Sequence, residues 1–135
     1  MSELGIKLET FVRYQAERQP GFKYQKQWAD NPAPDTGGKY WCLYVHNGEP
    51  SCLIGHAMWN AGLIDAGFES RRSNSNCFCS GLKWDIPALK QLDDAEWVWL
   101  SNVQLAQDGG KTWHDAVSNA DDKLSASPGG NESNG

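Results

Sequence analysis

The 135-residue sequence has no long apolar run, no basic stretch at its start and few basic residues overall. No segment approaches the roughly 18 apolar residues that a membrane-spanning helix needs. The opening residues, MSELGIKLETFVRYQ, lack the basic-then-apolar pattern of a secretory signal. We therefore expect a cytoplasmic protein that is not bound to a membrane. In that compartment its four cysteines are expected to be free thiols or ligands before disulfides.

The chain also lacks a phosphate-binding loop and an excess of basic residues, and both absences argue against classes of function that bind phosphate groups. Gly109-Gly110 follows a helical pattern and not a strand, so no glycine-rich phosphate loop is present. The chain has 12 Lys and Arg against 17 Asp and Glu, and the excess of acid is concentrated in residues 85–135. Non-specific binding to nucleic acid depends on neutralising phosphates. A nucleic-acid partner is therefore not expected.

The length allows one domain with a real core, which we place at residues 1–124. Residues 125–135, SASPGGNESNG, have almost no apolar side chains and are expected to be a disordered C-terminal tail. Seven tryptophans in so small a chain predict a Trp-rich core, a Trp-rich binding face, or both. No internal repeat is evident.

Periodicity and capping signals predict a small α+β domain, with a two-stranded antiparallel sheet packed by about four helices. The predicted elements are helices at 3–18 and about 52–61, strands at 22–28 and 39–46, and an αα-hairpin from Asp93 to Leu124. Asn47-Gly48 is interpreted as a turn into a helix, and Ser70–Asn76 as an exposed loop. The predicted core includes Trp41, Leu43, Val45, Leu53, Ala57, Leu100 and Val103.

Cys52 raises the possibility of a cysteine-dependent hydrolase. It stands at the predicted start of a helix, where the helix dipole and unpaired N–H groups lower the pKa of a thiol. His46 or His114 would have to act as the base. The apolar Leu53-Ile54 that follows favours a buried, inert thiol instead.

The same cysteine also belongs to a possible zinc site. Cys52 and His56 are four residues apart on the predicted helix and could share one metal with Cys77 or Cys79. This spacing matches no standard zinc finger or ribbon. A zinc-stabilised module associated with nucleic acid therefore stays an alternative, and we expect no metal or other cofactor.

The αα-hairpin is the predicted binding face. Trp97, Trp99 and Trp113 lie within twenty residues there, more than a short hairpin is expected to bury fully. The acidic residues predicted to surround them are Asp94, Glu96 and Asp108. Exposed aromatics within acidic surroundings suit a basic protein partner, and they would repel nucleic acid and anionic membrane. If all three indoles are buried, the 70–76 loop is the next candidate.

Two short blocks carry a resemblance to a known group of proteins. GEPSCLIGHA, at residues 48–57, and VQLAQDGGKTW, at residues 103–113, resemble small accessory proteins of bacteriophages that infect actinobacteria. The resemblance implies a viral protein acting in a bacterial cytoplasm, and it transfers no functional residue. We therefore expect a non-enzymatic interaction protein that binds a host protein, whose oligomeric state the sequence leaves open.

Overall fold

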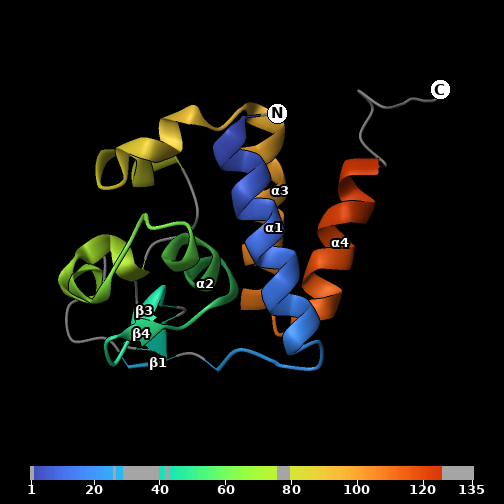
Figure 1. Cartoon of the computed structure of the whole chain (residues 1–135). Helices are drawn as coiled ribbons and strands as arrows, with labels where there is room; N and C mark the ends of the chain where they lie inside the picture. The colour runs from blue at the N-terminus through green and yellow to red at the C-terminus, as the bar shows by residue number, and fades with distance from the viewer. Residues whose placement is uncertain (1, 26, 29–39, 42, 76–79, 126–135) are drawn as a thin grey trace.

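The computed structural model describes residues 2–25, 27–28, 40–41, 43–75 and 80–125 (Figure 1). This part of the chain contains four α-helices and short antiparallel strands, which makes it the small α+β fold that the sequence predicts. The helices are α1 (Glu3–Arg18), α2 (Leu53–Asn60), α3 (Asp94–Asp108) and α4 (Trp113–Ser125). Each predicted helix is confirmed within about two residues. Apart from Ser125, the predicted tail lies outside the described residues.

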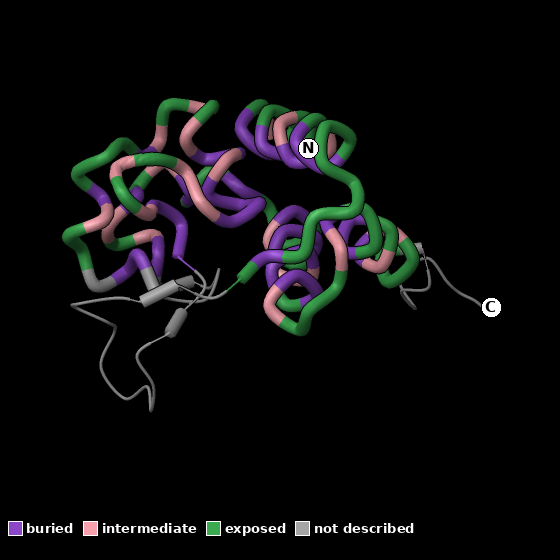
Figure 2. The backbone as a smooth tube through the Cα atoms, turned by 90° about the horizontal axis from the view of Figure 1, so that it is seen from below, coloured by how far each residue is buried: buried purple, intermediate pink, exposed green. Residues whose placement is uncertain are grey.

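The four helices surround one apolar core. α1 contacts α2 on one side and α4 on the other, and α3 packs against α2 and α4 (Figure 1). Buried residues follow the inner sides of the helices, and exposed residues their outer sides (Figure 2). Six of the predicted core side chains are at most 2% exposed: Leu43, Val45, Leu53, Ala57, Leu100 and Val103. The side chain of Trp41 lies outside what the structure describes.

The predicted pairing of the first two strands is confirmed, but the strands are short. β1 (Gln27–Trp28) runs antiparallel to β2 (Tyr40–Trp41), with Gln27 opposite Trp41. The predicted strands at 22–28 and 39–46 are longer than this. One reason is Tyr24, which is buried and whose hydroxyl accepts a hydrogen bond from the Leu43 N–H at 3.1 Å. A side chain therefore satisfies a backbone group that a longer sheet would have paired.

A second strand pair follows where the sequence predicted none. β3 (Val45–His46) and β4 (Glu49–Pro50) form an antiparallel hairpin, so the interpretation of Asn47-Gly48 as a turn into a helix is wrong. Asn47 and Gly48 have φ values of 54° and 78°, the left-handed backbone that a tight two-residue hairpin turn requires. Their N–H groups each donate to the carboxylate of Glu69 at 2.9 Å.

The described residues between α2 and α3 (61–75 and 80–93) include four short 3₁₀ helices. They are η1 (Ala66–Ser70), η2 (Arg72–Ser75), η3 (Ser80–Trp84) and η4 (Pro87–Gln91). The prediction of an exposed loop at 70–76 is wrong, because Ser73 and Asn74 are 8% and 4% exposed. The Asn74 amide donates to Val45 O (2.9 Å) and accepts from Val45 N (2.8 Å), as a neighbouring strand would. This segment therefore completes the hairpin and is a poor candidate for a binding loop.

In the described part of the chain, no helix combines the length and the apolar character needed to cross a membrane.

Leu100→Ala should lower the free energy of unfolding by about 2–5 kcal/mol, because Leu100 is 2% exposed and its removal leaves a cavity between helices. Leu105→Ala is the matched control on the same helix. Leu105 is 62% exposed, so the same change there should cost less than about 0.5 kcal/mol. Urea denaturation of both variants checks this, and equal losses would contradict the placement of α3.

Candidate functional site

The tryptophans of the α3–α4 hairpin do not form the exposed patch that the sequence predicts. Trp113 and Trp99 are 1% and 5% exposed, and Trp97 is half-buried. The Trp113 indole N–H donates to Gln107 Oε1 (3.2 Å), and the Trp99 indole N–H donates to Asp121 Oδ1 (2.9 Å). Trp99 and Trp113 are therefore core residues with satisfied polar atoms. Their prediction as exposed anchors is wrong.

The three acidic residues predicted for the binding face have different surroundings. Asp94 is exposed in the first turn of α3, and Asp108 is half-buried at its end. Glu96 is only 5% exposed, and its carboxylate accepts hydrogen bonds from Ser2 and from the backbone N–H of Asp93. Glu96 is therefore a structural residue, and its predicted place in an acidic binding surface is wrong.

The outward side of α3 does combine acidic and apolar side chains. Asp94, Val98 and Leu105, here named the outer stripe, follow at intervals of four and seven residues and so share one helix face. Val98 is 53% exposed and Leu105 is 62% exposed. The sequence analysis did not identify Val98 and Leu105 as binding residues, because they lie beside the predicted core stripe that begins at Trp97. Their seven-residue spacing outside that stripe is the signal that could have found them.

The hairpin that carries the outer stripe is strongly acidic. Residues 93–124 contain seven Asp and Glu against two Lys, which equals the formal net charge of −5 of the whole chain. Asp115 and Asp122 are exposed on α4, as Asp94 is on α3. The remaining residues of the chain are formally neutral in sum. A negative field is therefore concentrated on one supersecondary unit.

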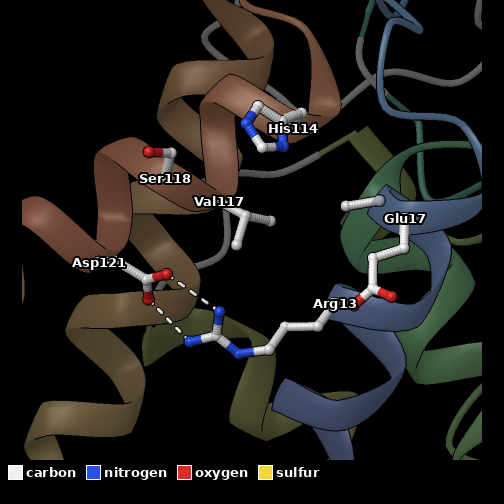
Figure 3. A pocket seen from close by; sticks show the side chains of 7 residues that line it. Arg13, Glu17, His114, Val117, Ser118 and Asp121 are labelled. Atoms are coloured by element: carbon white, nitrogen blue, oxygen red, sulfur yellow. Dashed lines mark hydrogen bonds and ion pairs between the residues drawn. The ribbon is translucent and has the colours of Figure 1, made fainter.

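A hollow of about 260 Å³ lies between α1 and α4. Figure 3 shows Arg13 and Glu17 on the α1 side, and His114, Ser118 and Asp121 on the α4 side. The Arg13 guanidinium makes two hydrogen bonds to the Asp121 carboxylate, at 2.7 and 3.0 Å, which are drawn as dashed lines. This bidentate pair joins the two helices across the floor of the hollow.

The ion pair is reinforced by two neighbours of Arg13. Arg13 Nε donates to Glu9 at 2.9 Å, and the guanidinium carbon lies 5.0 Å from the centre of the Trp99 ring. The hydrogen bond to Asp121 is the largest cause that raises the pKa of Arg13, and the same bond lowers the pKa of Asp121. Arg13 therefore keeps its charge and is held in place as a structural group.

Arg13 also lines a second hollow, of about 270 Å³, on its other side. Residues of α1, α3 and α4 line it, and its apolar side chains include Trp99, Leu100 and Leu124. A third hollow, between α1 and α2, is lined by polar residues and by His56. Ser118 and His114 both line the α1–α4 hollow, but among the described residues no hydrogen bond joins their side chains, and Asp121 is bonded to Arg13.

Cys52 is fully buried as the N-cap of α2, where its Sγ accepts a hydrogen bond from the Gly55 N–H at 3.3 Å. Desolvation raises the pKa of the Cys52 thiol to about 12, and this outweighs the hydrogen bonds that lower it. The predicted burial of this thiol is confirmed, and the lowered pKa that the hydrolase alternative requires is not found. A neutral, buried thiol is a poor nucleophile near neutral pH.

The histidines predicted as partners of Cys52 have other surroundings. His46 lies in β3 with its Nδ1 4.0 Å from Glu69, and His114 is exposed beside the α1–α4 hollow. His56 packs edge-on against Trp113, with ring centres 5.6 Å apart, and burial lowers its pKa. These contacts give no support to a shared catalytic site.

The proposed zinc site can be examined only in part. Cys77 and Cys79 lie outside the described residues, so their positions relative to Cys52 and His56 stay untested. Among the residues that the structure describes, no group of three or more His, Cys, Asp or Glu side chains could hold a metal ion.

The two blocks that carry the phage resemblance meet in the core. Gln107, in the second block, accepts hydrogen bonds from the Leu53 N–H (2.9 Å) and from Trp113 Nε1 (3.2 Å). Leu53 is the first residue of α2 and belongs to the first block. His56 of that block contacts Trp113. The two motifs are therefore explained by contacts that stabilise the fold, and need no shared chemistry.

Among the tryptophans whose side chains the structure describes, Trp84 is the most exposed, and sequence reasoning did not single it out. It ends η3 and is 82% exposed, and Lys90 Nζ lies 5.7 Å from its ring centre. Next to it, Lys83 Nζ lies 5.1 Å from the ring of Trp97 on α3. The available signal was local, since Trp84 stands between charged residues in a segment without a periodic apolar pattern.

Asp121→Asn should lower the free energy of unfolding by about 1 kcal/mol near neutral pH, because it removes a partly exposed ion pair. The lowered pKa of Asp121 means that this stabilisation is present above its ordinary pKa of 3.8 and is lost as the pH falls through the folded-state pKa. The two proteins should therefore converge in acid. Urea denaturation from about pH 7 to about pH 3 tests this, with the exposed Asp122→Asn as control. A constant difference at every pH would contradict it.

Cys52 should react with iodoacetamide only as fast as the protein opens, because the thiol is buried and its pKa is raised to about 12. Mass spectrometry of the Cys52 peptide over time measures this rate, and the same peptide in denaturant gives the unhindered rate. Rapid, selective labelling in the folded protein would revive the thiol hydrolase.

Comparisons with protein-family models, with curated proteins and with solved structures found nothing that matches this chain. The resemblance of the two blocks to phage proteins stays a prediction. The function must therefore be inferred from the chemistry of the surface and of the hollows.

Proposed function

We propose that this chain is a non-enzymatic interaction protein, encoded by a bacteriophage, that binds a basic host protein in the cytoplasm of an actinobacterium. The observation that carries the proposal is the charge of the α3–α4 hairpin, which equals the −5 of the whole chain. On this acidic hairpin, the outer stripe places two exposed aliphatic side chains, Val98 and Leu105, on the same face of α3 as Asp94.

The two features have different roles in binding. The acidic field speeds the encounter with a basic partner, and its effect falls as salt rises. Val98 and Leu105 supply the apolar contacts that slow dissociation once the surfaces meet. In this proposal they replace Trp99 and Trp113, whose indoles are committed to the core. Trp97 is half-buried at the edge of the same face.

The enzymatic alternative has less support. A cysteine hydrolase would need a thiolate near a base, whereas Cys52 is fully buried with a pKa of about 12. His114 is exposed on α4, and its hollow is lined by Arg13 and Asp121, which are paired with each other. A binding role requires none of these groups to react.

Immobilised wild-type protein should capture one or a few basic proteins from a lysate of an actinobacterial host. The double variant Val98→Glu/Leu105→Glu should lose them, because it removes both apolar contacts without adding positive charge. Quantitative mass spectrometry compares the baits, and calorimetry with the purified partner should show affinity at least about tenfold weaker for the double variant.

Ile6→Glu is the matched control for this capture. Ile6 is 51% exposed on α1, so the substitution adds the same charge to an equally exposed aliphatic position away from the hairpin. It should leave capture unchanged. Proteins that bind all three baits equally, or binding that does not weaken with salt, would contradict the proposed face.

A further inference from the structure

The charge of the chain is separated into two opposite regions. Residues 71–90 contain four Lys and Arg and one acidic residue, Asp85, whereas residues 93–124 contain two Lys and seven acids. Asp85 accepts hydrogen bonds from Arg71 (3.2 Å) and from Ser73. Lys83 and Lys90 instead lie over tryptophan rings. The segment before α3 therefore has a net positive charge, and its two lysines, Lys83 and Lys90, lie near the acidic hairpin or next to Trp84.

An exposed indole stands in this segment. Trp84 is 82% exposed and has Lys90 over one face of its ring, at 5.7 Å from the centre. Lys83 lies 5.1 Å from the ring of Trp97, in the second turn of α3. The group Lys83, Trp84 and Lys90, here named the Trp84 cluster, is thus held next to the start of the outer stripe.

The Trp84 cluster and the outer stripe are chemically complementary. One presents an exposed aromatic ring with Lys90 over it and Lys83 next to it in the chain, and the other presents two exposed aliphatic side chains on an acidic helix hairpin. We propose that two copies of this chain associate, with the Trp84 cluster of one copy on the outer stripe of the other. Tryptophan is enriched at interface hot spots, and opposite charges on the two surfaces would steer their encounter.

Nucleic acid fits the Trp84 cluster less well. Strand-binding surfaces combine several stacking aromatics with a continuous basic groove. Here Lys90 lies over one face of the Trp84 ring, and the adjoining hairpin would repel a polyanion. The outer stripe of a second copy is both acidic and apolar, so it suits the lysines and the aromatic ring of the Trp84 cluster.

Association through the outer stripe has a consequence for the proposed function. A copy bound there covers Val98 and Leu105, the residues that would contact a host protein. Self-association and host binding would then compete, and dilution would release the binding face. The association itself does not depend on whether a host partner exists.

Sedimentation velocity of the full chain over a range of concentrations tests the proposal. The wild type should associate reversibly at about 0.05 M salt, and more weakly at about 0.5 M. Trp84→Ala and Leu105→Glu should each raise the dissociation constant about tenfold or more. Ile6→Glu should leave it unchanged, since Ile6 lies on α1 at 51% exposure. Near-native circular dichroism confirms that each variant is folded.

Mixing the two weakened variants gives the decisive result. The Trp84→Ala chain keeps an intact outer stripe, and the Leu105→Glu chain keeps an intact Trp84 cluster. Together they should form a heterodimer that neither forms alone, measured by fluorescence anisotropy with one chain labelled. A wild type that stays monomeric throughout, or a mixture no stronger than its components, would overturn the proposal.

Two other outcomes would distinguish self-association from nucleic-acid binding and from host binding by a monomer. Binding of a labelled oligodeoxythymidine by the monomer, lost in Trp84→Ala, would assign the cluster to nucleic acid and overturn self-association. The second outcome is a chain that stays monomeric and still captures a host protein, with capture lost in Val98→Glu/Leu105→Glu but kept in Trp84→Ala. That result would also overturn self-association, and it would leave the proposed function standing.

Discussion

The carboxylate of Glu96 joins the first turns of α1 and α3, and the arrangement of the helices depends on this contact. It accepts hydrogen bonds from the backbone N–H groups of Ser2 (3.0 Å) and Asp93 (2.8 Å), and from the Ser2 hydroxyl (2.8 Å). Ser2 and Asp93 are the N-caps of the two helices. One carboxylate therefore serves two helix starts, where the helix dipoles also favour negative charge. A Cβ at Gly5 would overlap it, so glycine is needed for the close approach.

At the other end of α3, Gln107 makes a comparable junction. Its side-chain oxygen accepts from the Leu53 N–H at the start of α2 and from the indole of Trp113 at the start of α4. α3 is thus fixed to α1 at one end and to α2 and α4 at the other. The inner face of α3 packs against the other helices, whereas Val98 and Leu105 on its outer face are exposed. The core does not require their aliphatic character, which the proposed binding of a partner would account for.

The sequence predicts those parts of the fold that depend on local signals. The capping box at Asp93 and Glu96 and the stop at Gly109 located α3, because cap residues act on their own helix. The same sequence could not show that Ser2, at the far end of the chain, shares the Glu96 carboxylate. Glu96 was therefore placed on a binding surface when it is buried. The burial of Trp113 has the same cause, since segments distant in sequence cover it.

The short strands and the 3₁₀ helices could not be predicted from local signals in the sequence, for a different reason. Two-residue strands are too short to show an alternating pattern. Pro50 lacks an N–H and is uncommon inside strands, although it ends β4. Asn74 serves as a strand partner of Val45 through its side chain, and no periodicity in residues 70–76 reports this. Here tertiary contacts decide the structure, and local propensity has little influence.

The acidic residues divide into those that the fold uses and those that it leaves at the surface. Glu69 holds the β3–β4 turn and Asp121 holds Arg13, so their charges are accounted for by internal contacts. Asp94, Asp115 and Asp122 lie exposed on one hairpin. Solubility alone would explain exposed acids, but it would favour polar residues between them rather than aliphatic ones. The combination of surface charge and exposed aliphatic side chains on α3 therefore supports the proposal that this face binds another protein.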